Sequence, residues 1–288
     1  MEAAVFIKED KNMVVQHNIT AMNSNRQLGI TTGIQAKSSE KLSSGYKINR
    51  AADDAAGLAI SEKMRRQVRG LTQASANAQD GISAVQTAEG ALNEVHDMLQ
   101  RMNELAVKAA NDTITTKDRS YIQSEVDALV SEIHRTGEAT SFNDTKLLDG
   151  TFKNKNLQVG SDKNENNVIK IDIVALTASG LGIDGSKVKV TGSDGVNARN
   201  SIGTIKDALE TVSKQRSDLG AIQNRLEHTI KNLDNVVENT QAAESQIRDT
   251  DMAEEMVRYS NNNILAQAGQ SMLAQANQTN QGVLSLLQ

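Results

Sequence analysis

Three glycines have a spacing that could bind phosphate. Gly180, Gly182 and Gly185 spell G-x-G-x-x-G, but such a site also needs a helix N-terminus directly after the loop, where free backbone N–H groups face the anion. The segment that follows, SKVKVTGSDG, has the composition of strands and turns instead. We therefore interpret the three glycines as a turn and expect no nucleotide cofactor.

Metal ligands are also poorly arranged. Asp162, Asn164 and Asn166 begin like a calcium-binding loop, which requires a glycine at its sixth place and a glutamate at its twelfth. Those places hold Asn167 and Ile173. No histidine has a second ligand at helical spacing, as a zinc site would need. The histidines are His17, His96, His134 and His228. We expect no metal ion and no other cofactor.

Catalytic nucleophiles lack the surroundings that would activate them. The chain has no Cys, so thiol catalysis, disulfides and zinc thiolates are all excluded. It has no G-x-S-x-G turn, and its lone histidines lie in long helical segments that form no pocket for a nucleophile and its base. We expect no enzymatic activity.

A basic cluster could contact nucleic acid. It consists of Lys63, Arg65, Arg66 and Arg69. No aromatic residues are interleaved with it for base stacking, and the chain carries 31 basic against 36 acidic residues, a net charge of -5. A solvated face or a face that contacts another subunit is the better interpretation, and we expect no nucleic-acid partner.

Arg101 and Leu105 lie four residues apart, on one face of a predicted helix. They fall outside the apolar seam of that helix, so the sequence predicts an exposed leucine beside a guanidinium. Arginine and apolar anchors dominate the binding energy of protein interfaces. The pair therefore suits a protein contact, but a single surface leucine is equally common without one. The residues alone do not name a partner.

The composition indicates long helices packed through narrow seams. The chain of 288 residues has no Pro, no Cys and no Trp, and aromatics make up 2% of it. Its apolar content of 38% comes mainly from Ala, Leu, Val and Ile. No run of about 18 apolar residues occurs and the start lacks the pattern of a secretion signal, so we expect no membrane insertion and no signal-peptide export.

The clearest periodic pattern lies between Leu58 and Ala110. Its apolar residues are alternately three and four residues apart, which is a heptad seam: Val85, Ala88, Leu92, Val95, Leu99, Met102, Ala106 and Ala109. A shorter stretch repeats the spacing after a polar turn and is predicted to fold back on the first helix as a hairpin. Its apolar residues are Ile122, Val126, Leu129 and Ile133.

The middle of the chain has a different pattern. Ile169, Ile171 and Ile173 alternate with polar residues, which predicts a strand, and Leu157 and Val159 could supply its partner. Helical spacing resumes at Ile202 and predicts a second long helix. Its apolar residues are Leu219, Ile222, Leu226, Leu233, Val236 and Ile247.

The two ends of the chain resemble each other. Val14–Ser44 and the segment beyond Asp251 are rich in Gln, Asn, Ser and Ala and carry only thin apolar stripes. Such helices are marginal alone, so they should pair with each other or with other copies. Residues 1–12 share no pattern with the rest and are interpreted as a non-native extension, because Met13 opens a second plausible start. Assembly is the function that these ends favour.

Long stretches of the sequence resemble bacterial flagellin. They are LSSGYKINRAADDAAGLAI, LTQASANAQDGISAVQTAEGALNEVHDMLQRMNELAVKAAN, SDLGAIQNRLEHTI and ILAQAGQSMLAQANQ with the ending VLSLLQ. The resemblance covers about Met13–Gly160 and Ser201–Gln288. It implies a mainly α fold, in which a long coiled-coil helical bundle carries a small β-hairpin and the terminal helices pair as an inner-tube coiled coil, disordered in the monomer. It also implies a compact form without large outer domains.

The resemblance divides the chain into six parts. They are the extension 1–12, the N-terminal inner-tube helix and spoke linker 13–57, the N-terminal core helices 58–140, the β-hairpin and vestigial variable region 141–200, the C-terminal core helix 201–250 and the C-terminal inner-tube helix 251–288. The implied function is that of a secreted, extracellular subunit that polymerises with its own copies into the flagellar filament.

Further partners are implied by the same resemblance. They are the flagellar export chaperone, the filament cap, the hook-junction proteins and Toll-like receptor 5. The receptor motif aligns onto LQRMNELAVKAAN and IQSEV, which places Arg101, Leu105 and Glu125 at the receptor contacts. The assembly and chaperone tail is Val283, Leu284, Leu286 and Leu287. Two alternatives stay open at this point: a hook-filament junction protein that shares the end sequences, and a coiled-coil signalling rod.

Overall fold

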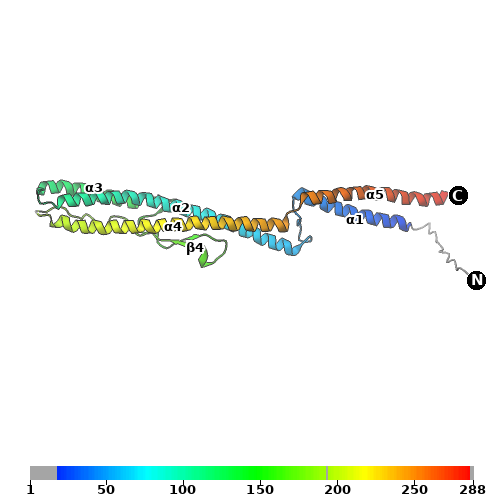
Figure 1. The fold of residues 1–288 in the computed structure, drawn as a ribbon, viewed down its shortest axis with the longest axis horizontal. Helices are drawn as coiled ribbons and strands as arrows, with labels where there is room; N and C mark the ends of the chain where they lie inside the picture. Colours follow the sequence, from blue (N-terminus) through cyan, green and yellow to red (C-terminus); the bar gives the residue numbers. More distant parts are fainter. Residues whose placement is uncertain (1–17, 193, 286–288) are drawn as a thin grey trace, which may run out of the picture. The chain divides into compact units, whose positions relative to one another are not determined.

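The computed structural model describes residues 18–192 and 194–285, with side chains up to residue 279 (Figure 1). The chain divides into two compact units. One takes residues up to Met64 and from Ala242 onward, and the other takes Arg65–Gln241. Two long helices, α2 (Ala55–Ala109) and α4 (Val196–Arg248), contribute residues to both units. The expected extension 1–12 lies outside the described residues.

The first unit is built on the pairing of α1 (Ile19–Ser44) with α5 (Met252–Ser285). The side-chain amide of Asn18 caps α1 by accepting a hydrogen bond from the backbone N–H of Ala21, and it donates across to the carbonyl of Ala276 at 2.8 Å. A Cβ on Gly269 would meet Leu28 Cδ1 at 3.3 Å, so this glycine lets the two helices approach closely. The predicted pairing of the terminal helices is therefore confirmed.

The core between these two helices is small. Its buried apolar residues are alanines, namely Ala21, Ala266 and Ala276, while Ser38 and Glu255 are buried polar residues. An alanine side chain removes little apolar area from water, so the pair gains little free energy from its own packing. This agrees with the marginal terminal helices that the sequence predicts.

The segment between α1 and α2 is held by contacts within the same unit. Gly45 ends α1 with a positive φ of 75°, a left-handed backbone that glycine adopts without strain. The next residues pair with the end of α4, since Lys47 N donates to the carbonyl of Arg248 at 2.7 Å. The Arg248 guanidinium lies 4.8 Å from the ring centre of Tyr46 and 3.1 Å from Glu62. Asp54 then caps α2 by accepting from Gly57 N.

The second unit packs α2, α3 (Thr116–Ala139) and α4 around one core. All eight residues of the predicted α2 seam are buried, none more than 1% exposed, so this prediction is confirmed. In α3 the predicted stripe is nearly right. Ile122, Val126 and Ile133 are buried, but Leu129 is half-buried and Val130 completes the buried row instead.

Two small antiparallel strand pairs lie between α3 and α4. Strands β3 (Lys155–Gln158) and β4 (Val168–Ile171) pair with Leu157 opposite Ile169, joined through the 3₁₀ turn η1 (Glu165–Asn167), as the alternating isoleucines predict. The pair β1 (Ser141–Phe142) and β2 (Thr145–Lys146) was not predicted. Its turn residues Asn143 and Asp144 both have positive φ, the geometry of a two-residue hairpin turn.

The first turn of α4 lies against the end of α2. A Cβ on Gly195 would meet the carbonyl oxygen of Ala110 at 2.4 Å, and this oxygen belongs to the backbone, which cannot easily move away. Gly195→Ala should therefore displace α4 and lower the free energy of unfolding by about 1–3 kcal/mol. Urea unfolding of the monomeric chain, followed by circular dichroism, measures the change.

Gly203 provides the matched control for this prediction. Gly203 lies within α4, eight residues after Gly195, and no atom lies within 4 Å of a Cβ added there. Gly203→Ala should raise the free energy of unfolding by up to about 1 kcal/mol, because alanine favours the helix over glycine. Equal effects of the two substitutions would contradict the close approach at Gly195.

Candidate interaction surfaces

Arg101, Leu105 and Glu125 lie together, as the resemblance implies. The Arg101 guanidinium spans from α2 to α3, donating from Nε and Nη2 to Glu125 Oε1 at 3.0 and 2.9 Å, and from Nη1 to Glu104 at 3.1 Å. These hydrogen bonds, the one to Glu125 first, raise the pKa of Arg101. Both helices in this contact are fixed by the buried seam beneath them.

Leu105 is buried, not exposed as the sequence predicts. Its side chain is only 3% exposed and belongs to the core of the second unit. The prediction was wrong because α3 covers the flank of α2 beside the heptad seam, and Leu105 packs into that flank. Leu105 is therefore a core residue of the second unit.

A groove of about 500 Å³ opens over these residues. Arg101, Leu105 and Glu125 line it together with residues that the sequence analysis missed, including Ile114 and Tyr121. Tyr121 is exposed in α3. The sequence signal that could have identified Tyr121 is an aromatic residue outside the apolar stripe of its helix, in a chain with only three tyrosines. The groove is lined by apolar side chains and by charged ones, among which Arg101 and Glu125 form a hydrogen-bonded pair.

A second surface lies on α1 and α5. Large apolar side chains of both helices point to solvent although the two helices are paired. On α1 they are Ile19, Met22, Ile30 and Ile34, and on α5 they are Met252, Met256, Val257, Ile264, Leu265 and Met272. Of the predicted tail, Val283 and Leu284 lie in the last turn of α5, whose side chains are not described, and Leu286 and Leu287 lie outside the described residues.

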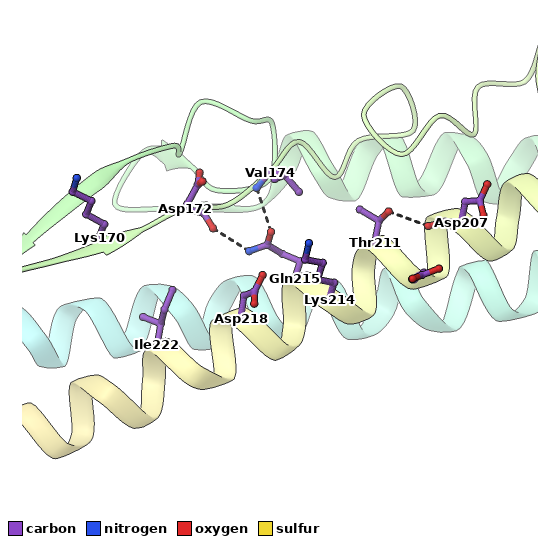
Figure 2. A pocket seen from close by; sticks show the side chains of 10 residues that line it. Lys170, Asp172, Val174, Asp207, Thr211, Lys214, Gln215, Asp218 and Ile222 are labelled. Carbon is purple, nitrogen blue, oxygen red and sulfur yellow. Dashed lines mark hydrogen bonds between the residues drawn. The ribbon is translucent and has the colours of Figure 1, made fainter.

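A third surface is a groove of about 640 Å³ between β4, the segment that follows it and α4 (Figure 2). Gln215, which is 5% exposed, fixes its wall. The amide of Gln215 donates to the carbonyl of Asp172 at 3.0 Å and accepts from Val174 N at 3.5 Å. Most of the other side chains around this groove are charged.

The glycine motif and the Asp162–Asn166 motif both lie in turns. Gly180, Gly182 and Gly185 lie in a turn segment, and the next helix, α4, begins only at Val196, so no helix starts directly after them. Asn164 caps η1 by accepting from Asn166 N. Among residues 18–192 and 194–285, no three metal-ligating side chains come together. Within the same ranges, no helix is both long and apolar enough to cross a membrane.

Comparison with known proteins decides between the remaining functions. Residues 15–153 match the bacterial flagellin N-terminal helical region, and residues 202–287 match the bacterial flagellin C-terminal helical region. The flagellin of Halalkalibacterium halodurans is 54% identical over 275 residues, which are 96% of this chain and all of that protein. The chain belongs to the bacterial flagellin family. It is a structural subunit that self-associates into the flagellar filament, not an enzyme.

Other relatives agree with this flagellin assignment. The flagellar filament 31.3 kDa core protein of Treponema maltophilum is 50% identical, and the flagellin of Bacillus subtilis is 48% identical. Each match covers 96% of this chain and the whole relative. This flagellin is therefore a compact form without a large outer domain. These relatives favour the filament subunit over the junction protein and the signalling rod.

One solved structure shows a similar helical fold over about two thirds of this chain. A putative flagellar hook-associated protein of Vibrio parahaemolyticus has a TM-score of 0.56 at 15% identity, over 68% of this chain and all of that chain. The crystal structure of Bacillus cereus flagellin has a TM-score of 0.47 at 26% identity, over 55% of this flagellin and 88% of that chain. The first likeness supports the helical fold alone.

Proposed function

We propose that this flagellin polymerises through its paired terminal helices, as the inner-tube segments 13–57 and 251–288 of an extracellular filament. The observation that carries this proposal is the exposed apolar surface of α1 and α5. Ile264 and Leu265 are 65% and 57% exposed. Burying one such side chain in a protein contact is worth about 1.5–3 kcal/mol. Neighbouring copies would supply that burial, and contacts repeated along a polymer add up.

The same proposal assigns a part of the subunit to each remaining segment of the chain. Segments 58–140 and 201–250 form the core helices of the subunit, and 141–200 forms the hairpin with a vestigial variable region. Residues Val283, Leu284, Leu286 and Leu287 would bind an export chaperone before assembly. The filament cap and the hook-junction proteins would meet the subunit at the growing tip and at the base of the filament.

Thiol labelling tests whether neighbouring copies cover α5. The chain has no Cys, so Leu265→Cys introduces a single thiol. A maleimide should modify it rapidly in the monomer and at least about tenfold more slowly in the filament, because burial blocks access to the thiolate. Depolymerised filaments should regain the monomer rate. Equal labelling in both states would show that α5 is not covered on assembly.

A second activity is favoured by the groove at Arg101. We propose that the free subunit is a ligand of Toll-like receptor 5 and that Arg101 and Glu125 make the polar contacts. The Arg101–Glu125 pair is already oriented by hydrogen bonds between two packed helices, so binding costs little side-chain entropy. Tyr121 and Ile114, which line the groove beside the pair, offer apolar anchoring area. Leu105 supports this surface from below and touches the receptor little.

Variants of the charged pair test the receptor contact. Arg101→Ala should reduce receptor activation by monomer about tenfold or more, since arginines are enriched among the few residues that carry most of the binding energy of an interface. Reporter-cell activation against concentration measures the effect. Arg135→Ala is the matched control, because Arg135 is also exposed and paired with an acidic side chain three residues away. Equal potency of both variants would refute the assignment.

The effect of a Leu105 substitution on receptor activation has a different physical origin. Leu105→Ala should destabilise the second unit by about 2–5 kcal/mol, because the side chain is buried. A loss of activation with this variant would therefore report on folding. Leu105→Met keeps the volume and should leave activation nearly unchanged.

A further inference from the structure

The groove between β4 and α4 carries charges that its own unit does not neutralise (Figure 2). Four carboxylates and two ammonium groups line it: Asp172, Asp207, Glu210, Asp218, Lys170 and Lys214. All six side chains are exposed, and none forms an ion pair with another residue that the structure describes. The groove therefore has an excess of two negative charges.

The groove is also a formed surface. Gln215 holds the segment after β4 against α4 through its two backbone hydrogen bonds. Val174 and the half-buried Ile222 add apolar lining between the charges. A partner group that is long, cationic and partly apolar would satisfy both features. An arginine side chain has this character, because its stem packs on apolar surface while its guanidinium binds carboxylates.

The same unit offers two such arginines elsewhere. Arg66 and Arg69 are exposed on one face of α2, three residues apart, and neither has an ion pair within the described part of the chain. Their two positive charges equal the excess negative charge of the groove. Asp207 and Glu210 are also three residues apart on one face of α4. The two acidic side chains can therefore pair with the two arginines when the helices that carry them lie side by side.

Arg66 and Arg69 cannot reach the groove of their own subunit. Leu71 shares a buried cluster with Leu233, and Ala78 shares one with Leu226. The arginines therefore lie beside α4 near Val236, roughly 22 residues and about 33 Å along the helix from the middle of the groove. Only a second copy that is shifted by about this length along the axis of α4 can bring the arginines and the acidic groove together.

We propose that Arg66 and Arg69 of one subunit bind the acidic groove of a neighbouring subunit in the filament. Self-association is a property of this family, so a second copy is the occupant that must be present. The contact fixes the axial shift between the two copies, because a different shift would leave both surfaces unpaired. The binding energy of this contact comes from carboxylate–guanidinium pairs that the surrounding helices shield from solvent.

Charge reversal tests this contact in the full chain. Arg66→Glu with Arg69→Glu should raise the critical concentration for seeded polymerisation at least tenfold, as should Asp207→Lys with Glu210→Lys, because like charges then face each other. A chain with all four substitutions restores opposite charges and should polymerise within about threefold of the original. Sedimentation of filaments measures the critical concentration.

Unfolding of each monomeric variant controls for damage to the subunit, and it should be unchanged because all four residues are exposed. Recovery in the fourfold variant would support the contact, since general weakening of the filament cannot produce it. The proposal would be overturned if the fourfold variant polymerised no better than the worse pair. It would also be overturned if only the groove variant were affected, which would assign the groove to another partner.

Discussion

Arg119→Met is expected to lower the free energy of unfolding of the second unit by about 3 kcal/mol, because it leaves one buried and two partly buried carbonyl groups without their donors. Arg119 is 1% exposed. Its guanidinium donates to the carbonyls of Ala109 at 2.9 Å, Gly192 at 3.1 Å and Asn111 at 3.2 Å. Methionine keeps much of the volume of the arginine side chain but none of its hydrogen-bond donors. The loss of stability therefore measures the contribution of the hydrogen bonds.

The expected loss of stability arises at the C-terminal end of α2. The last carbonyls of a helix have no intrahelical partner, and here the carbonyl of Ala109 is buried within the unit. Arg119 satisfies them from α3 and holds the segment at Gly192, close to the start of α4, in the same step. One side chain therefore joins three segments of the second unit.

Chemical unfolding of the monomer measures this effect, with Arg135→Met as the control. Arg135 lies on the same helix and is exposed, where its ion pair with Glu132 contributes little to stability because solvent screens it. Arg135→Met should therefore change stability little. If Arg119→Met and Arg135→Met cost the same, the guanidinium of Arg119 would not be holding the end of α2.

Ile264→Gln with Leu265→Gln is expected to raise the critical concentration for polymerisation about a hundredfold. Each exposed side chain gains roughly 1.5 kcal/mol or more on burial against a neighbouring copy, and 1.4 kcal/mol corresponds to a factor of ten. Glutamine has a similar length and helix propensity to leucine. The monomer should therefore unfold as before, while seeded growth is strongly reduced.

A conservative pair separates burial from shape in this experiment. Ile264→Leu with Leu265→Ile keeps the apolar area and should polymerise within about tenfold of the original chain, since volume-conserving swaps cost less than about 1.5 kcal/mol. Sedimentation after seeding measures both variants. An unchanged critical concentration with the two glutamines would mean that α5 meets solvent in the filament.

The long helices could be predicted because their signal is repeated. The α2 seam from Val85 to Ala109 has eight apolar residues in heptad spacing, and each of them is buried. The pairing of Leu157 with Ile169 followed from alternation over a few residues. By contrast, β1 and β2 have two residues each, too few for any period to appear.

Other features depend on contacts that no local pattern encodes. The burial of Leu105 arises because α3 covers the side of α2 next to the seam, and a heptad pattern shows only the seam itself. The burial of Arg119 arises because it meets the end of another helix, and its neighbours in sequence are polar. The groove near Gln215 brings β4 against α4 over a separation of more than 40 residues.

Electron microscopy of seeded growth tests the central claim most directly, which is that the terminal helix pair drives assembly. The full chain and a chain that ends at Thr250 would be incubated with short filament seeds at the same concentration and inspected by negative stain. Long uniform filaments from the full chain alone are the predicted result. Filaments from both chains would contradict the role given to α5, and their absence from the full chain would contradict polymerisation itself.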